Sequence, residues 1–413
     1  MTQLPHSSLA SPKLSLAGAS LIGIASMLGA GVFVVFAPAA KLSGSYVLVA
    51  IAIAGIVAAL NARSMRQLSR VFPKAGGTYA FGRRYLSDTW GFLAGVSFIL
   101  GKIGSVSAIS LAAAAYIYPT AKVQVAIAAL LVMTVINFFG INRTAMGALV
   151  LSLPTIALLL LVGFTGLVQP GSTIDTQPSL VGVISAASLI FFAFAGYARV
   201  ATLGEEVRDP SRNVPRSITI GLIVVLTLYL MVGNALSLGL GPTLENSVAP
   251  ILGYTNQVMP WIPSEVVIAI AASACLGSLL SLLAGISRTG AAMAQDGEIP
   301  RVFSKRSKSF NSPWAAEMAI AAISIVLVSS GDIVWTIGIS SFLVLCYYAI
   351  ANLAAYKQLT TGMLTSKILA LAGLASCILL AGFVPLQSLL IGIGGLSLAL
   401  ALRAGLKKAR VSS

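Results

Sequence analysis

Residues 188–216 read SLIFFAFAGYARVATLGEEVRDPSRNVPR, and we expect the rest of the chain to be organised around this stretch. An apolar run loses its helical character at residues 191–196, where small residues alternate with aromatics. The stretch stops at Asp209-Pro210, because proline lacks an N–H donor and disfavours helix in the residue before it. A helix interrupted inside a membrane exposes unpaired carbonyl and N–H groups, so it persists only where it faces protein or a water-filled cavity. The alternative is that Gly196 merely kinks or closely packs a continuous helix.

The composition indicates a membrane protein. The chain has 413 residues, of which 57% are hydrophobic and only 9% are charged, and its mean hydropathy is +0.96. A soluble protein of this length needs far more surface charge, and apolar windows of about 17–25 residues suit single membrane spans. We predict an all-α polytopic protein with about twelve spans, which start near residues 15, 44, 89, 121, 145, 180, 214, 264, 313, 332, 367 and 385.

The formal charge of +15 invites a nucleic-acid-binding interpretation, but the placement of the charge argues against it. With the N-terminus inside, cytoplasmic segments hold all of the 26 lysines and arginines except four. Lys41 and Lys122 lie on the outer side, and Lys102 and Arg199 lie in the membrane. This asymmetry follows the positive-inside rule. We therefore expect both termini to be cytoplasmic, with the lipid bilayer and not a nucleic acid as the partner.

The first span contains a second candidate interruption, SMLGAG at residues 26–31. Two glycines within three residues expose backbone N–H groups, which the following half-helix presents with the positive end of its dipole. If the spans include two inverted repeats of five, spans one and six occupy corresponding positions. Glycine-interrupted segments at such positions are the best sequence indication of a transporter's midplane binding site. With both interruptions present, we favour a binding site over a simple kink.

Four blocks appear along the chain in a familiar order. They are GIASMLGAGVF at 23–33, FPKAGGTYAFG at 72–82, FFAFAGYARVATLGEEVRDPSRNVPRSI at 191–218 and SRTGAAMAQDGEIPRVF at 287–303. Together they resemble the amino acid–polyamine–organocation superfamily of secondary transporters, and specifically its bacterial amino acid permeases. The resemblance covers nearly the whole chain. It implies a five-plus-five inverted repeat with discontinuous helices 1 and 6 and two extra C-terminal helices, in a bacterial plasma (inner) membrane.

This organisation divides the chain into five parts. We expect a cytoplasmic N-terminal tail at 1–13, a first five-helix repeat at 14–168, a second repeat at 180–356, two C-terminal helices at 365–404 and a cytoplasmic tail at 405–413.

The resemblance also implies where a substrate binds. The carboxylate-binding backbone corresponds to residues 26–31, the ammonium-binding carbonyls to about 191–194, and Phe192 to an aromatic over the substrate. A zwitterion presents one anion and one cation, which suit a helix N-terminus and a helix C-terminal end. Three rings within four residues cannot all point one way, so we expect only one or two to line the pocket. The candidate substrate-binding residues are Ser26, Met27, Gly29, Ala30, Gly31, Phe191, Phe192, Phe194 and Gly196.

The intramembrane lysine is the candidate coupling residue. Lys102 lies about 18 Å along its helix from Trp90, near the midplane, where a charged lysine costs several kcal/mol unless it is paired or hydrated. A buried lysine can gain and lose a proton. Some relatives carry a lysine in span five, but that span is uncharged here, so their coupling mechanism does not transfer directly. The alternative is a structural lysine that snorkels or permanently bonds the carbonyls of a broken helix.

Arg199 and Glu206 are candidate gating residues, because they lie seven positions apart and share one helix face. Every acidic residue falls in a loop or at a span end, which disfavours a carboxylate-based sodium site and recognition of a dication. The single histidine, His6, lies in the polar tail, and the three cysteines lie in apolar spans without motif spacing. We therefore expect no catalytic residue, metal or cofactor.

The sequence predicts an amino acid permease that works by alternating access, with a neutral α-amino acid as its substrate and proton coupling or exchange. The alternatives are an amino acid exporter or exchanger and an organic amine transporter. A membrane-embedded enzyme would need convergent carboxylates, histidines or metal ligands at depth, and a channel would need polar residues repeated around a pore. Both fit the sequence less well.

Overall fold

The structure is a computed structural model that describes residues 14–29, 31–72, 76–139, 144–169, 179–197, 200, 207–307, 310, 312–359 and 363–411. This part of the chain is built of helices joined by turns and carries one isolated β-bridge, between Leu14 and Val207. The helices are α1 (Leu16–Leu28), α2 (Gly31–Val34), α3 (Phe36–Ser43), α4 (Val47–Val71), α5 (Gly77–Tyr85), α6 (Asp88–Ile117), α7 (Lys122–Phe138), α8 (Thr144–Thr165), α9 (Leu180–Phe194), α11 (Pro210–Leu240), α12 (Pro250–Val258), α13 (Ser264–Gln295), α14 (Trp314–Val328), α15 (Ile333–Gln358), α16 (Leu364–Gly382) and α17 (Leu386–Val411).

The predicted spans are confirmed as helices. Each predicted start lies within a few residues of an observed helix start. Within the described ranges, 10 helical segments are long and apolar enough to cross a membrane, and two shorter apolar helices, Leu153–Thr165 and Trp314–Val328, occupy the fifth and ninth predicted positions. The all-helical polytopic class is therefore correct.

Polar caps start several of these apolar helices. Ser15, Ser87 and Ser179 each accept a hydrogen bond from a backbone N–H in the first turn of α1, α6 and α9. The Asp332 carboxylate accepts from Trp335 N at 3.0 Å and begins α15. Such caps satisfy N–H groups that a helix cannot pair internally, which matters most where little water is present. Pro210 occupies the first turn of α11, so the next helix starts at the Asp209-Pro210 pair; residues 201–206, where the preceding stretch would end, lie outside the described residues.

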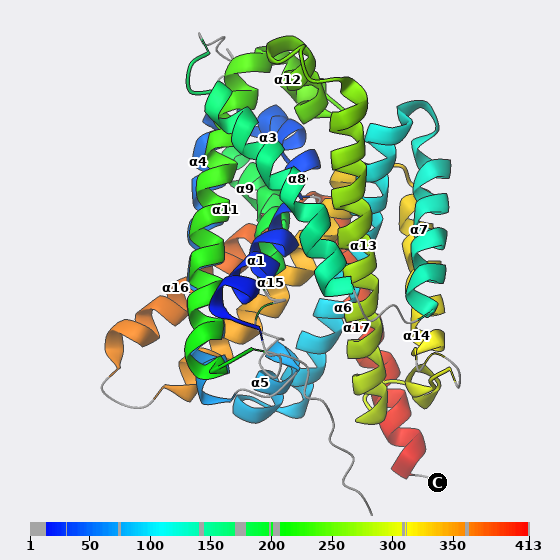
Figure 1. The fold of residues 1–413 in the computed structure, drawn as a ribbon. Helices are drawn as coiled ribbons and strands as arrows, with labels where there is room; N and C mark the ends of the chain where they lie inside the picture. The colour runs from blue at the N-terminus through cyan, green and yellow to red at the C-terminus, as the bar shows by residue number, and fades with distance from the viewer. Residues whose placement is uncertain are drawn as a thin grey trace, which may run out of the picture.

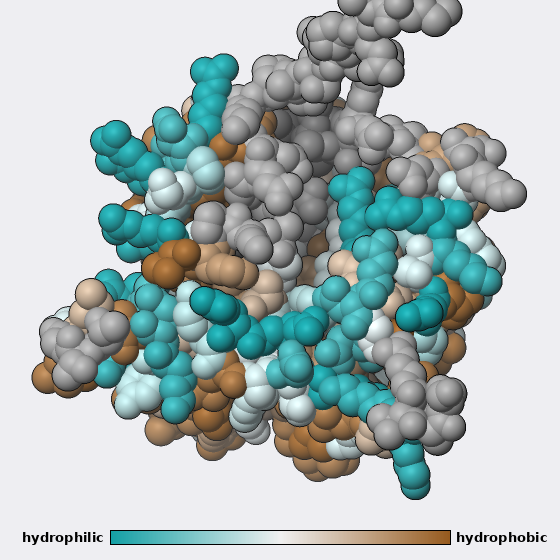
Figure 2. Space-filling view, turned by 90° about the horizontal axis from the view of Figure 1, so that it is seen from below, coloured by the Kyte–Doolittle hydropathy of each residue, from teal (hydrophilic) through white to brown (hydrophobic). Residues whose placement is uncertain are grey.

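The helices form one bundle around two central members (Figure 1). The apolar windows of α6 and α15 are 78% and 72% buried, and the two helices pack against each other. The window of α17 is only 11% buried, so this helix lies at the periphery. In Figure 1, α12 covers one end of the bundle and α5 the other. We call the end that carries α5 the basic end; hydrophilic residues gather on it in Figure 2, which views the molecule from that side.

A buried ion pair ties α17 to the basic end. Both side chains are almost fully buried, and the Arg403 guanidinium makes a bidentate contact with the Glu298 carboxylate, in which Nη2 donates to Oε1 at 3.1 Å. Arg403 also donates to Thr89 Oγ1 at 3.0 Å and lies 4.7 Å above the Phe92 ring. Arg403 therefore fixes the peripheral helix α17 to the start of α6, and its charge is paired with Glu298 inside the protein.

We expect Arg403→Gln to destabilise the purified protein by about 3 kcal/mol, because it leaves the Glu298 carboxylate buried without a partner. The measurement is the thermal melting temperature in detergent. Lys407→Gln, one turn later on the same helix and exposed, is the matched control and should leave the melting temperature unchanged. Equal melting temperatures for the two variants would contradict a structural role for this pair.

Candidate functional site

The first predicted interruption is present. Helix α1 ends at Leu28 and α2 begins at Gly31, so the first span is discontinuous at the predicted glycines. Ala30, one of the candidate binding residues, lies outside the described residues. The Ser26 hydroxyl donates to the Ile22 carbonyl at 2.7 Å, and in this conformation its hydrogen is used within its own helix.

The second interruption begins later than predicted. Helix α9 continues through Phe194, and a 3₁₀ turn follows at Ala195–Tyr197. The expectation that residues 191–194 are already non-helical is therefore wrong. Alternating phenylalanine and alanine is compatible with helix, and Gly196 is the only strong breaker in the run. The last turn tightens where Ala195 N donates to the Phe192 carbonyl, three residues back.

The two interruptions cross in direct contact. A methyl group placed on Gly31 would lie 2.6 Å from the Cα atom of Ala193, at the end of α9. A methyl group on Gly196 would collide with the backbone carbonyl of Ser26, at the end of α1. The start of α2 therefore packs on the end of α9, and the end of α1 packs on the turn that follows α9. This approach is closer than any side chain permits, which explains the glycines at both places.

A tyrosine from α11 joins the two interruptions. The Tyr229 hydroxyl lies 2.6 Å from the Met27 carbonyl and 3.1 Å from the Ala193 carbonyl, and the side chain is fully buried. A hydroxyl has one proton, so it donates to one of these carbonyls at a time. Sequence reasoning missed this residue, because Tyr229 lies in an ordinary apolar span and its partners are distant along the chain.

Lys102 reaches the second interruption from α6. Its Nζ atom donates to the Ala195 carbonyl at 3.2 Å, and the side chain is 6% exposed. No ion pair of Lys102 occurs within the described ranges, so the observed partner of its amine is a backbone carbonyl. This is the bond expected of a structural lysine at a broken helix, and it places the amine at the break itself.

Two of the three predicted rings are packed against tyrosines. Phe191 makes an edge contact with Tyr348, with ring centroids 5.9 Å apart, and Phe194 makes one with Tyr229 at 5.0 Å. Tyr348 also stacks on Tyr197 at 5.0 Å. Phe192 is 7% exposed and has no ring contact among the described aromatic pairs. The expectation that one or two of the three rings line a pocket therefore rests on Phe192.

A second residue that sequence reasoning missed faces the first interruption. A methyl group placed on Gly29 would collide with the Ser278 hydroxyl of α13. The Ser278 side chain of α13 therefore packs against the first interruption. Glu317, assigned to a span end, is 3% exposed and accepts from Asn137 Nδ2 at 3.0 Å, so it is a further buried ionisable side chain, besides Lys102 and the Arg403–Glu298 pair.

Polar contacts join the helices above and below these interruptions. Toward α12, the Tyr116 hydroxyl donates to the Phe33 carbonyl at 3.3 Å and accepts from Ile251 N at 3.4 Å. Toward the basic end, Arg83 of α5 lies 3.2 Å from the carboxylate of Asp296, which also accepts from the Tyr79 hydroxyl. Burial and the carboxylate raise the pKa of Tyr79. The predicted gating residues Arg199 and Glu206 lie outside the described residues.

Comparisons with known proteins identify relatives of this chain. Residues 18–392 match the family model described as amino acid permease. An uncharacterized transporter of Mycobacterium tuberculosis (strain ATCC 25618 / H37Rv) is 40% identical over 400 residues, which cover 94% of this chain and 90% of the relative. Cationic amino acid transporter 7 of Arabidopsis thaliana is 24% identical, covering 82% of this chain and 64% of the relative. The branched-chain amino acid permease BcaP of Bacillus subtilis is 25% identical, covering 75% and 72%.

Proposed function

This chain belongs to the amino acid permease family, and on that premise we propose that it carries neutral α-amino acids by alternating access, coupled to a proton or to exchange. The observation that carries the proposal is the crossing of the two helix interruptions. The crossing brings the N-terminal end of α2 beside the C-terminal end of α9. A zwitterion needs both polarities a few ångströms apart, which this crossing supplies from backbone alone.

A neutral side chain is the substrate that the surroundings favour. The groups that meet at the crossing within the described ranges are backbone, Ser278, Tyr229, aromatic rings and the ammonium of Lys102. None of these is a carboxylate, and a second cation beside Lys102 would be repelled in a site with little water. One relative is named for cationic amino acids and another for branched-chain amino acids, so the names of the relatives do not decide between a cationic and a neutral substrate.

Alternating access requires that the ends of the site open in turn. The basic end is the cytoplasmic side of a bacterial plasma membrane in this proposal, because positive charge is retained inside. The α5–α13 contact at Asp296 would then separate for release into the cytoplasm, and the Tyr116 contact between α2 and α12 would separate for entry from outside. Transport in the reverse order gives an exporter with the same site.

The direct experiment is uptake into proteoliposomes. A panel of labelled amino acids is supplied with and without an inward proton gradient, and again with unlabelled substrate trapped inside. We expect accumulation of one or a few neutral amino acids. Stimulation by the gradient indicates proton coupling, and stimulation by trapped substrate indicates exchange. Accumulation of arginine or lysine in preference to all neutral amino acids would contradict the substrate class.

Phe192 is expected to cover the bound substrate. Phe192→Ala should weaken transport by roughly tenfold or more, as for a buried aromatic contact, whereas Phe192→Trp should be tolerated or should shift preference among substrates. The measurement is KM and kcat across the same panel. Phe164→Ala removes a ring that is 58% exposed and serves as the control. Unchanged substrate profiles in both Phe192 variants would assign that ring to packing.

A further inference from the structure

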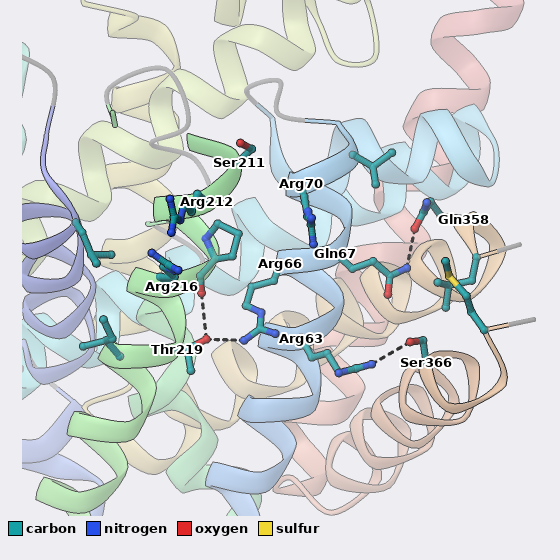
Figure 3. Close-up of a pocket in the computed structure, with 16 residues that line it drawn as sticks. Arg63, Arg66, Gln67, Arg70, Ser211, Arg212, Arg216, Thr219, Gln358 and Ser366 are labelled. Atoms are coloured by element: carbon teal, nitrogen blue, oxygen red, sulfur yellow. Dashed lines mark hydrogen bonds between the residues drawn. The ribbon is translucent and has the colours of Figure 1, made fainter. Parts of the chain in front are cut away.

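A cavity of about 1150 Å³ opens between α4, α11 and α16 at the basic end (Figure 3). None of the residues described at the crossing of the two interruptions lines it. It lies between the last turns of α4 and the first turns of α11, and the end of α15, the start of α16 and Leu16 at the start of α1 also line it. Its polar lining consists of Arg63, Arg66, Gln67, Arg70, Ser211, Arg212, Arg216, Thr219, Gln358 and Ser366. We call it the arginine groove.

Among the described residues, five arginines and no acidic residue line the arginine groove. Arg63 donates to the Ser366 hydroxyl at 3.0 Å and Arg66 to the Thr219 hydroxyl, and both side chains are half-buried. None of the five arginines takes part in an ion pair within the described ranges. Each guanidinium has five N–H donors, so most of the donors on Arg63 and Arg66 are left for a ligand. Clustered cations with neutral partners repel one another, and an anion would relieve that repulsion.

The same groove has an apolar side. Val71, Ile220 and Met363 line it and are 55%, 40% and 52% exposed. Leu364, beside Met363, and Ile223, one turn after Ile220, are 70% and 61% exposed. The arginines of α4 belong to a segment, Phe36–Val71, that is long and apolar enough to span the membrane. A soluble anion needs no such wall, whereas a phospholipid presents a phosphate and an acyl chain together.

We propose that the arginine groove binds the headgroup of an acidic phospholipid from the leaflet at the basic end. The phosphate lies against Arg63 and Arg66, the exposed guanidiniums of Arg70, Arg212 and Arg216 contact the outer part of the headgroup, and an acyl chain follows Val71 and Ile220. Basic pockets between membrane helices select such lipids by charge. A bound lipid links α4 to α11 and α16. The inference does not depend on which amino acid the protein carries.

Thermal stability of the full chain in a neutral detergent tests the proposal without any transport assay. Short-chain phosphatidylglycerol should raise the melting temperature in a saturable manner, whereas short-chain phosphatidylcholine and inorganic phosphate at equal concentration should not. A shift with inorganic phosphate alone as large as that with phosphatidylglycerol would reassign the groove to a soluble anion. An equal shift with phosphatidylcholine would reassign it to nonspecific lipid packing.

Two sets of variants locate the effect. Arg63→Gln combined with Arg66→Gln should raise the phosphatidylglycerol concentration needed for half the shift by roughly tenfold or more. Arg212→Gln combined with Arg216→Gln changes only exposed side chains, so this second double variant should fold even if the first does not. It should also raise the phosphatidylglycerol concentration needed for half the shift. Arg84→Gln removes one exposed charge of α5, which is not in the groove, and is the control. A titration curve for both pairs equal to that of Arg84→Gln would overturn the proposal.

Discussion

Substitution of Gly31 by alanine is expected to abolish transport. Its added methyl carbon would lie 2.6 Å from both Cα and Cβ of Ala193, and a backbone atom cannot swing aside. The crossing of α2 and α9 would therefore open by a substantial fraction of an ångström. Displacement of a binding geometry by about 1 Å can cost roughly a hundredfold in rate, so we expect at least that loss in uptake.

The measurement is uptake by reconstituted protein together with equilibrium binding of labelled substrate. Gly290→Ala is the matched control, since it is also a buried glycine of a membrane helix, but its added methyl group would meet nothing nearer than 3.9 Å. Elution as a single species and an unchanged melting temperature show that a Gly31 variant is folded. A folded Gly31→Ala protein with wild-type binding and uptake would place the substrate elsewhere.

The second large effect is expected at Lys102. If this side chain carries the coupled proton, Lys102→Met should lose accumulation driven by a proton gradient and should flatten the pH dependence of uptake. The Lys102 amine donates to the Ala195 carbonyl of the second interruption. Loss of the proton weakens that bond, so protonation and the shape of the site are linked. Exchange of substrate for substrate should survive, because the backbone groups at the crossing remain.

Comparison with arginine separates coupling from structure. Lys102→Arg keeps the charge but cannot release a proton, so under coupling it should resemble Lys102→Met in lacking pH dependence. Under a purely structural role, Lys102→Met would lower the yield of folded protein and Lys102→Arg would partly restore it. Glu317→Gln removes a buried carboxylate that has no ion pair within the described ranges, and it should leave the pH dependence intact. A Lys102→Met protein that accumulates substrate with wild-type pH dependence would remove this lysine from the coupling mechanism.

The positions of the helices were predictable from the sequence, because length and hydropathy dominate folding in a bilayer. A helix must pair all its backbone groups internally there, so an apolar window of sufficient length has one stable structure. The first interruption was also predicted correctly, at Gly29 and Gly31, because glycine weakens a helix and permits close backbone contact. At the second, the sequence placed the break at Phe191, whereas the helix continues to Phe194. Aromatic and small residues determine how one face of a helix packs, and they do not by themselves end the helix.

The partners of the site residues could not be predicted. Lys102 was identifiable as an expensive intramembrane charge, but its acceptor, Ala195, lies 93 residues away. Tyr229 and Tyr348 look like ordinary residues of apolar spans, and their roles depend on the crossing of helices that are distant in sequence. Local patterns predict local structure, and the long-range contacts of the site arise only when the bundle assembles.

Competition by substrate analogues measures whether an amino acid is held at both of its charged ends by the backbone of the two crossing interruptions. Uptake of the best substrate from the panel is measured against its methyl ester, which lacks the carboxylate, and against its deamino analogue, which lacks the ammonium group. We expect each analogue to compete roughly a hundredfold or more less well, because it leaves buried polar groups unpaired. Either analogue competing as well as the substrate itself would contradict recognition at the crossing.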